Sequence, residues 1–157
     1  MKFRHILLLA LVCLVGPALA STPMPADHEH AMRQIPEGST LPSLSLALHR
    51  DTKSGFNLAI QTKDFYLEPP ELASDNQGLI LEGHAHIFIN GEKIYRAYSQ
   101  HIHLPAELFD EGINQIMVSL NDHEHNTWSK GSRMVMSTLV IDNGEQDYLK
   151  HQFSTFE

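Results

Sequence analysis

The sequence contains four pairs of histidines in which a single residue separates the two rings. In a β-strand, residues i and i+2 point to the same face about 6.5–7 Å apart, so both imidazoles of a pair can reach one metal ion without bending the backbone. Imidazole suits zinc, copper, nickel and iron. The pairs are His28 and His30, His84 and His86, His101 and His103, and His123 and His125.

The His84/His86 pair lies in a segment that is typical of a β-hairpin. Residues 79–90 form the first predicted strand, and Asn90-Gly91 favours a two-residue type I′ turn because both positions accept positive φ. Residues 93–99 then form the return strand. The predicted cross-strand pairs are Ile89 with Glu92, His86 with Tyr95, and His84 with Ala97.

The next pair, His101 and His103, has the parity of the strand face that carries His84. In the predicted register, however, His101 lies about 13 Å along the strand from His84. One flat hairpin therefore does not assemble all four rings. A bend or bulge near Ser99 and Gln100, or approach from a neighbouring strand, is required.

The pair His123 and His125 follows an apolar strand that ends at Leu120. Asp122 and Glu124 alternate with these histidines, and such carboxylates can orient the ring N–H groups of metal ligands. The alternative interpretation is a solvated polar loop with no ligand role.

A second possible metal site lies near the N-terminus. Residues 21–42 hold four prolines among small and polar residues, so we predict a flexible tail. The tail combines thioethers with imidazoles, a mixture that soft Cu(I) accepts and hard cations do not. A charged disordered leader is the competing interpretation. The four candidate ligands are Met24, His28, His30 and Met32.

The rest of the sequence predicts an all-β sandwich. Short alternating segments are separated by turn signals about every ten residues, and no long helix is indicated. We expect one β-sandwich domain of about seven strands over residues 43–142, with a C-terminal extension over 143–157. The predicted strands cover residues 43–50, 56–60, 79–90, 93–99, 113–120 and 134–141.

Residues 1–20 have the features of a secretory signal peptide. Lys2 and Arg4 precede a short apolar run, and Ala18-Leu19-Ala20 resembles a cleavage site. The only cysteine, Cys13, lies inside this segment, so the mature chain would have no thiol for disulfides, thiolate metal sites or nucleophilic catalysis. We therefore expect a periplasmic or secreted protein.

The formal net charge of −8 at pH 7 also restricts the partners of the chain. An acidic surface repels nucleic acid and anionic membranes, and it attracts cations. No segment after the signal has the roughly 18–20 consecutive apolar residues that span a bilayer. We expect no nucleic-acid partner and no membrane insertion of the mature chain.

Four short motifs resemble, in order, the landmarks of a family of small secreted bacterial domains. They are FYLEP (65–69), GHAHIFINGEKIYR (83–96), HLP (103–105) and LNDH (120–123). Members are mostly uncharacterised, have immunoglobulin-like or cupredoxin-like sandwiches, and are thought to bind copper. The resemblance implies that four histidines approach one another at one end of the sandwich: His84, His86, His103 and His123. His101 and His125 depart from the family pattern as additional possible ligands.

Our leading hypothesis is a periplasmic copper-binding protein for tolerance, storage or delivery. Imidazoles bind Cu(II), and copper leads the Irving–Williams order, while methionines add affinity for Cu(I). Zinc is the alternative metal. The partner would be the metal ion itself and, for delivery, another periplasmic copper protein.

Two other classes of function fit the same residues. A secreted zinc- or copper-dependent metalloenzyme could use three histidines, an open coordination position and Glu82, Asp122 or Glu124 as a general base. No HExxH motif, nucleophile elbow or phosphate-binding loop supports catalysis, so we expect a binding protein rather than an enzyme. A non-catalytic interaction sandwich is the third class.

Overall fold

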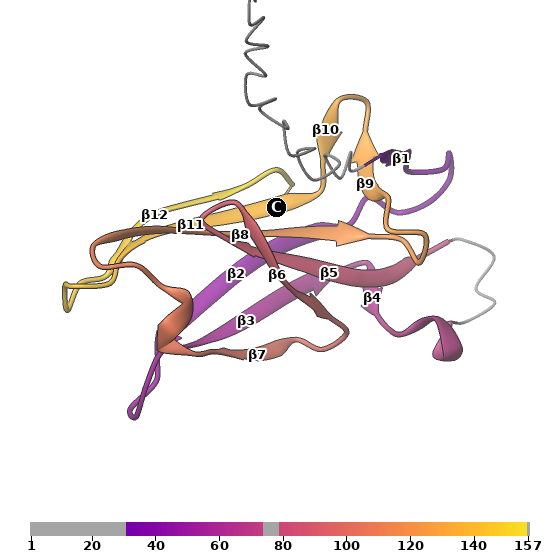
Figure 1. The fold of residues 1–157 in the computed structure, drawn as a ribbon. Helices are drawn as coiled ribbons and strands as arrows, with labels where there is room; N and C mark the ends of the chain where they lie inside the picture. Colours follow the sequence, from indigo (N-terminus) through magenta and orange to yellow (C-terminus); the bar gives the residue numbers. More distant parts are fainter. Residues whose placement is uncertain (1–30, 74–78, 157) are drawn as a thin grey trace, which may run out of the picture.

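A computed structural model describes residues 31–73 and 79–156. Within these residues the protein is all-β, with nine strands connected in one sheet and three in another. The two sheets pack face to face, with the smaller one lying below the larger one in Figure 1. The predicted β-sandwich is confirmed. No helix in the described ranges has the length and apolar character needed to cross a membrane.

The smaller sheet contains three antiparallel strands. β2 (Ser43–Arg50) pairs with β3 (Phe56–Lys63), and β3 pairs with β7 (His101–Leu104). Alternating leucines of β2 are buried while the residues between them are more exposed, which is the period-two pattern of a strand with one face in the core.

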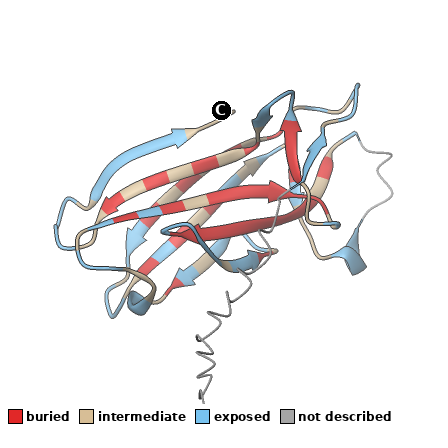
Figure 2. Cartoon of the chain, turned by 45° about the horizontal axis from the view of Figure 1, so that its top comes forward, coloured by how far each residue is buried: buried red, intermediate tan, exposed pale blue. Residues whose placement is uncertain are grey.

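The body of the larger sheet contains five antiparallel strands. β5 (Leu81–Ile89), β8 (Ile113–Asn121) and β11 (Met136–Asp142) form its centre. β6 (Glu92–Ala97) pairs with β5 at one edge, and β12 (Leu149–Ser154) pairs with β11 at the other. In Figure 2, β12 is mainly exposed whereas β5 is buried along nearly all its length.

Short elements complete the larger sheet. β9 (Thr127–Lys130) joins the end of β8 and pairs with β10 (Arg133–Met134) and, in parallel, with β1 (Met32–Gln34). β1 and β9 lie side by side at the upper right of Figure 1. β4 (Phe65–Leu67) pairs in parallel with β5. Two 3₁₀ turns, η1 (Pro70–Leu72) and η2 (Ala106–Leu108), occupy connections.

The hydrophobic core fills the space between the sheets. β5 contributes Ala85, Ile87 and Ile89 to it. Because side chains alternate along a strand, the residues between these three face the opposite side of the larger sheet. The two histidines of β5 are therefore on the outer face of the sandwich. They are His84 and His86.

The predicted β5–β6 hairpin forms, but its register changes within the strand. Asn90 and Gly91 both have positive φ, as the predicted turn requires. Ile89 pairs with Glu92 as predicted, and a bulge then shifts the pairing. His86 consequently lies opposite Arg96 rather than Tyr95, and the predicted register beyond the bulge is wrong. β6 pairs only with β5, and edge strands tolerate such bulges.

Three segments outside the predicted strands contain a strand. β9 lies between the predicted strands 113–120 and 134–141, and the predicted flexible tail over 21–42 includes β1. β12 lies in the predicted extension over 143–157 and continues the sandwich sheet. None of these short segments has strong alternation of its own. β1 pairs with β9, which is distant in the sequence, whereas β12 pairs with β11, the strand before it.

Gly83 permits the close contact of β5 and β8 just before the histidine pair. Its φ is +151°, and a Cβ atom there would lie 2.0 Å from the backbone oxygen of Asn121. Only glycine avoids this overlap. The backbone oxygen of Gly83 also accepts a hydrogen bond from the amide of Glu68. The glycine of the GHAH motif therefore has a structural role.

We expect Gly83→Ala to reduce the free energy of unfolding by at least about 2 kcal/mol, because the overlap is with backbone that has little room to move. Urea unfolding measures the effect. Gly91→Asn is the matched control, since a Cβ at Gly91 meets no atom within 4 Å and asparagine tolerates this turn. Equal stability of the two variants would contradict the steric role of Gly83.

Candidate metal centre

Three histidine rings converge on the outer face of the larger sheet. Nε2 of His84 lies 2.9 Å from Nε2 of His86, and Nδ1 of His125 lies 3.3 Å from the same His86 nitrogen. One nitrogen from each ring lies within 4.8 Å of the others. Among the histidines, cysteines and carboxylates of the described residues, these three histidines form the group that is placed to hold a metal ion.

The nitrogen spacing matches the edges of a metal coordination polyhedron. Two nitrogens that each lie about 2.0–2.1 Å from a tetrahedral metal are about 3.3 Å apart, and at a right angle they are about 2.9 Å apart. A neutral imidazole carries one N–H and one lone pair. Three such rings that face one point can form few hydrogen bonds with one another, because each has a single donor and a single acceptor. All three lone pairs can instead bind one cation. The group therefore fits a metal-binding role.

The histidine pair is buried although it faces away from the core. His84 and His86 are each 1% exposed. The ring of Tyr98 lies 5.6 Å from that of His84, and the His125 ring lies 4.9 Å from it. The His86 and His125 rings are stacked with centroids 5.4 Å apart. These neighbours shield the strand pair from water.

Burial keeps His84 and His125 in a state that can bind metal. Removal from water, followed by repulsion from His125 and Arg96, lowers the pKa of His84 to about 4. Burial and the positive charges of Arg96 and Lys93 also lower the pKa of His125, against the opposing effect of Asp122. Both rings are thus neutral near pH 7, and metal binding there releases no proton from them.

His123 lies near this group with its ring nitrogens unsatisfied. Both Nδ1 and Nε2 of His123 are buried and have no hydrogen-bond partner within the described part of the chain, and the same holds for Nδ1 of His84. The His123 ring also contributes to the lowered pKa of His84. Burying an unpaired polar group costs about 1–3 kcal/mol. A cation that recruits His123 as a fourth ligand would remove part of this cost.

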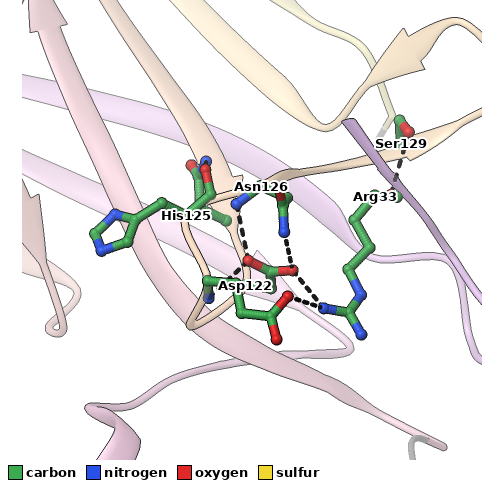
Figure 3. Close-up of polar contacts among 7 residues, drawn as sticks. Arg33, Asp122, His125, Asn126 and Ser129 are labelled. Atoms are coloured by element: carbon green, nitrogen blue, oxygen red, sulfur yellow. Dashed lines mark hydrogen bonds and ion pairs between the residues drawn. The ribbon is translucent and has the colours of Figure 1, made fainter. Parts of the chain in front are cut away.

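Asp122 fixes the loop that delivers His125. Its Oδ1 accepts hydrogen bonds from the amides of Glu124 (2.9 Å) and Asn126 (2.8 Å), and its Oδ2 accepts one from Nδ2 of Asn126 (3.0 Å). Burial opposes the ionisation of Asp122, but the hydrogen bonds from Asn126 and Arg33 outweigh it and lower its pKa. His125 adopts a left-handed φ of 73° in this turn. Figure 3 shows its ring projecting away from the carboxylate of Asp122.

Arg33 of β1 anchors the same loop from a distant part of the sequence. Nη1 of Arg33 donates to Oδ2 of Asp122 at 2.9 Å and to Glu124 at 3.1 Å. Its guanidinium also lies 5.6 Å from the centre of the Trp128 ring. In Figure 3, Arg33 and the His125 ring lie on opposite sides of the Asp122 loop. The ion pair therefore positions His125 without contacting the metal-binding nitrogens.

We expect Asp122→Ala to lower the free energy of unfolding by about 2–3 kcal/mol, because it leaves the part-buried loop amides and Arg33 without their acceptor. Metal affinity should fall by about 10- to 100-fold as His125 loses its orientation. Glu124→Ala is the matched control: it removes the exposed carboxylate partner of the same arginine and should change stability by less than about 1 kcal/mol. Urea unfolding and metal titration of both variants measure these effects. Equal stability and equal metal affinity of the two variants would contradict a positioning role for Asp122.

The structure brings some of the predicted ligands together and places others elsewhere. His84, His86 and His125 come together, with His123 close to them. His101 and His103 lie on β7 of the smaller sheet and are exposed, and they do not approach the buried group. Their strand pairs with β3 instead of extending the β5–β6 hairpin. Met24, His28 and His30 lie outside the described residues, whereas Met32 is exposed on β1.

Two arginines that lie around the site had no sequence motif of their own. Arg33 is separated from Asp122 by 89 positions, and Arg96 reaches His86 only because of the β-bulge. The one available signal was the interleaving of Asp122 and Glu124 with the histidine pair. We predicted that these carboxylates orient ring N–H groups, whereas Asp122 accepts hydrogen bonds from loop amides and from Arg33. Comparisons with models of protein families, with curated proteins and with solved structures find no match to the chain. The resemblance to the copper-associated family stays a prediction.

Proposed function

We propose that this protein binds copper in the periplasm and serves copper tolerance, storage or delivery. The observation that carries the proposal is the convergence of three imidazoles, with contacts of 2.9 and 3.3 Å between their nitrogens. Such sites accept several divalent ions, and copper binds most strongly in the Irving–Williams order. The signal-like residues 1–20, which lie outside the described ranges, support export.

The surroundings of the site favour holding an ion over turning over a substrate. Asp122, a candidate general base, already accepts hydrogen bonds from Arg33 and Asn126. Its lowered pKa makes it a poor proton acceptor. Glu124 also pairs with Arg33. We therefore assign Asp122 to loop positioning rather than to proton transfer, and binding remains the preferred function.

The test is titration of residues 21–157 with Cu(II), Cu(I) and Zn(II), in parallel with the His84→Ala/His86→Ala variant. We expect copper to bind with a submicromolar Kd and more tightly than zinc, and we expect the variant to lose the tight site. A chain that binds no copper ion below micromolar Kd would refute the proposal. Preference for zinc over both copper ions would retain a metal site but reject copper as its natural occupant.

A further inference from the structure

A second group of histidines surrounds a hollow on the outer face of the smaller sheet. The hollow has a volume of about 480 Å³, and its lining includes His49 of β2 and both histidines of β7. Ala47 and Ala59 lie between them. The small alanine side chains leave room above the sheet. The β7 histidines are His101 and His103.

The strand register places these histidines around one point of the sheet. His49 pairs with Asn57, which in turn pairs with His103, so the three residues form one row across β2, β3 and β7. His101 lies in the next row on the same face, opposite Ala59. Adjacent strands are about 4.8 Å apart and residues i and i+2 about 6.5–7 Å apart. Rotation of the exposed rings therefore brings two or three imidazoles over the alanines.

Hydrogen bonds that link Asp51, Asn57 and His103 hold the His103 ring in the tautomer that can bind a metal ion. Nδ2 of Asn57 donates to Oδ2 of Asp51 at 2.9 Å, which leaves Oδ1 of Asn57 as an acceptor. Nδ1 of His103 lies 3.1 Å from this oxygen and must be the donor. In the neutral ring, Nε2 then carries the lone pair. Metal-binding histidines typically donate their other N–H to such an oxygen.

We propose that His103, His101 and His49 form a second, solvent-open site for Cu(II). The hollow contains imidazoles and no sulfur ligand, which favours Cu(II) over Cu(I). These rings are not already gathered as the buried group is, so binding must restrict exposed side chains. Its affinity is therefore lower than that of the buried site. An accessible site of this kind suits the uptake or exchange of copper at the surface.

This site is independent of the buried one because the two lie on the outer faces of different sheets. The test uses the full mature chain with His28→Ala/His30→Ala in every protein, which removes possible tail ligands. We expect the background with His84→Ala/His86→Ala/His125→Ala to keep one weaker Cu(II) equivalent. Adding His101→Ala/His103→Ala should remove it. In the background that keeps His101 and His103, substoichiometric Cu(II) should broaden the imidazole NMR signals of these two residues first.

Asn57→Leu provides a second variant, because it keeps all three histidines and removes the relay that orients His103. We expect its weaker site to lose about tenfold in Cu(II) affinity. The proposal is overturned if Cu(II) binding is insensitive to His101→Ala/His103→Ala, or if broadening is confined to other histidines. These outcomes leave the buried site intact. Conversely, Cu(II) binding that depends only on His101 and His103 would refute the buried site and support this one.

Discussion

Saturating copper should raise the melting temperature of residues 21–157 by about 10 °C, and His84→Ala/His86→Ala should remove most of this shift. A ligand at 100 times its Kd that binds only the folded state adds about 2.7 kcal/mol to the free energy of unfolding. For a domain of this size, that corresponds to about 10 °C. The folded protein holds the three nitrogens together, whereas the unfolded chain does not.

Scanning calorimetry with and without Cu(II) measures the shift separately for each protein, so a change in the baseline stability of a variant does not affect the comparison. His125→Ala is a second variant that leaves β5 intact and should remove most of the shift. His151→Ala, on the exposed strand β12, is the matched control and should retain it. Equal shifts in all four proteins would show that copper binds outside the buried group.

Without metal, the protein should lose up to about 3 kcal/mol of stability between pH 6.5 and pH 4 through His84 alone. Its folded pKa of about 4 is below the ordinary value of 6.5, so in this window the unfolded state binds more protons. Stability contributed by the neutral ring is present above pH 6.5 and is lost as the pH falls toward 4. Burial of the ring at 1% exposure is the main cause.

Urea unfolding at several pH values between 7 and 4 measures this loss. His84→Leu is the comparison variant, because leucine has similar bulk and no titrating group, and its pH dependence should be shallower by about 3 kcal/mol over the window. His101→Leu removes an exposed histidine and serves as the control. The prediction is wrong if the wild type and His84→Leu lose stability in parallel. Asp122, whose pKa is lowered in the folded state, is present in all three proteins, so its own pH dependence is shared by them and cancels in the comparison.

Period-two patterning determined the β-sandwich and the shared face of His84 and His86. Alternation of side chains is a local property of a strand, so it can be read from a few residues. The Asn90-Gly91 turn was predictable for the same reason, because its positive φ angles belong to the turn itself. The lack of thiols after residue 13 is likewise a property of sequence alone, and it limits the metal ligands to imidazole, carboxylate and thioether.

Only the tertiary structure decided which histidines meet. His125 reaches His86 from 39 positions away because β8 pairs with β5 and ends beside it. His103 lies in the other sheet because β7 pairs with β3. Such pairings depend on packing between distant segments, and local periodicity does not encode them. The bulge in β6 similarly depends on edge geometry, which moved Arg96 beside His86.

The sequence thus determined that His84 and His86 share one face of a strand and that no cysteine follows residue 13. The tertiary structure selected one member of the His123/His125 pair to complete the buried group, and it supplied Arg33 from β1 to hold the loop. The physical reason is that a strand fixes the direction of its own side chains, whereas the distance between strands is fixed only when the sheets assemble.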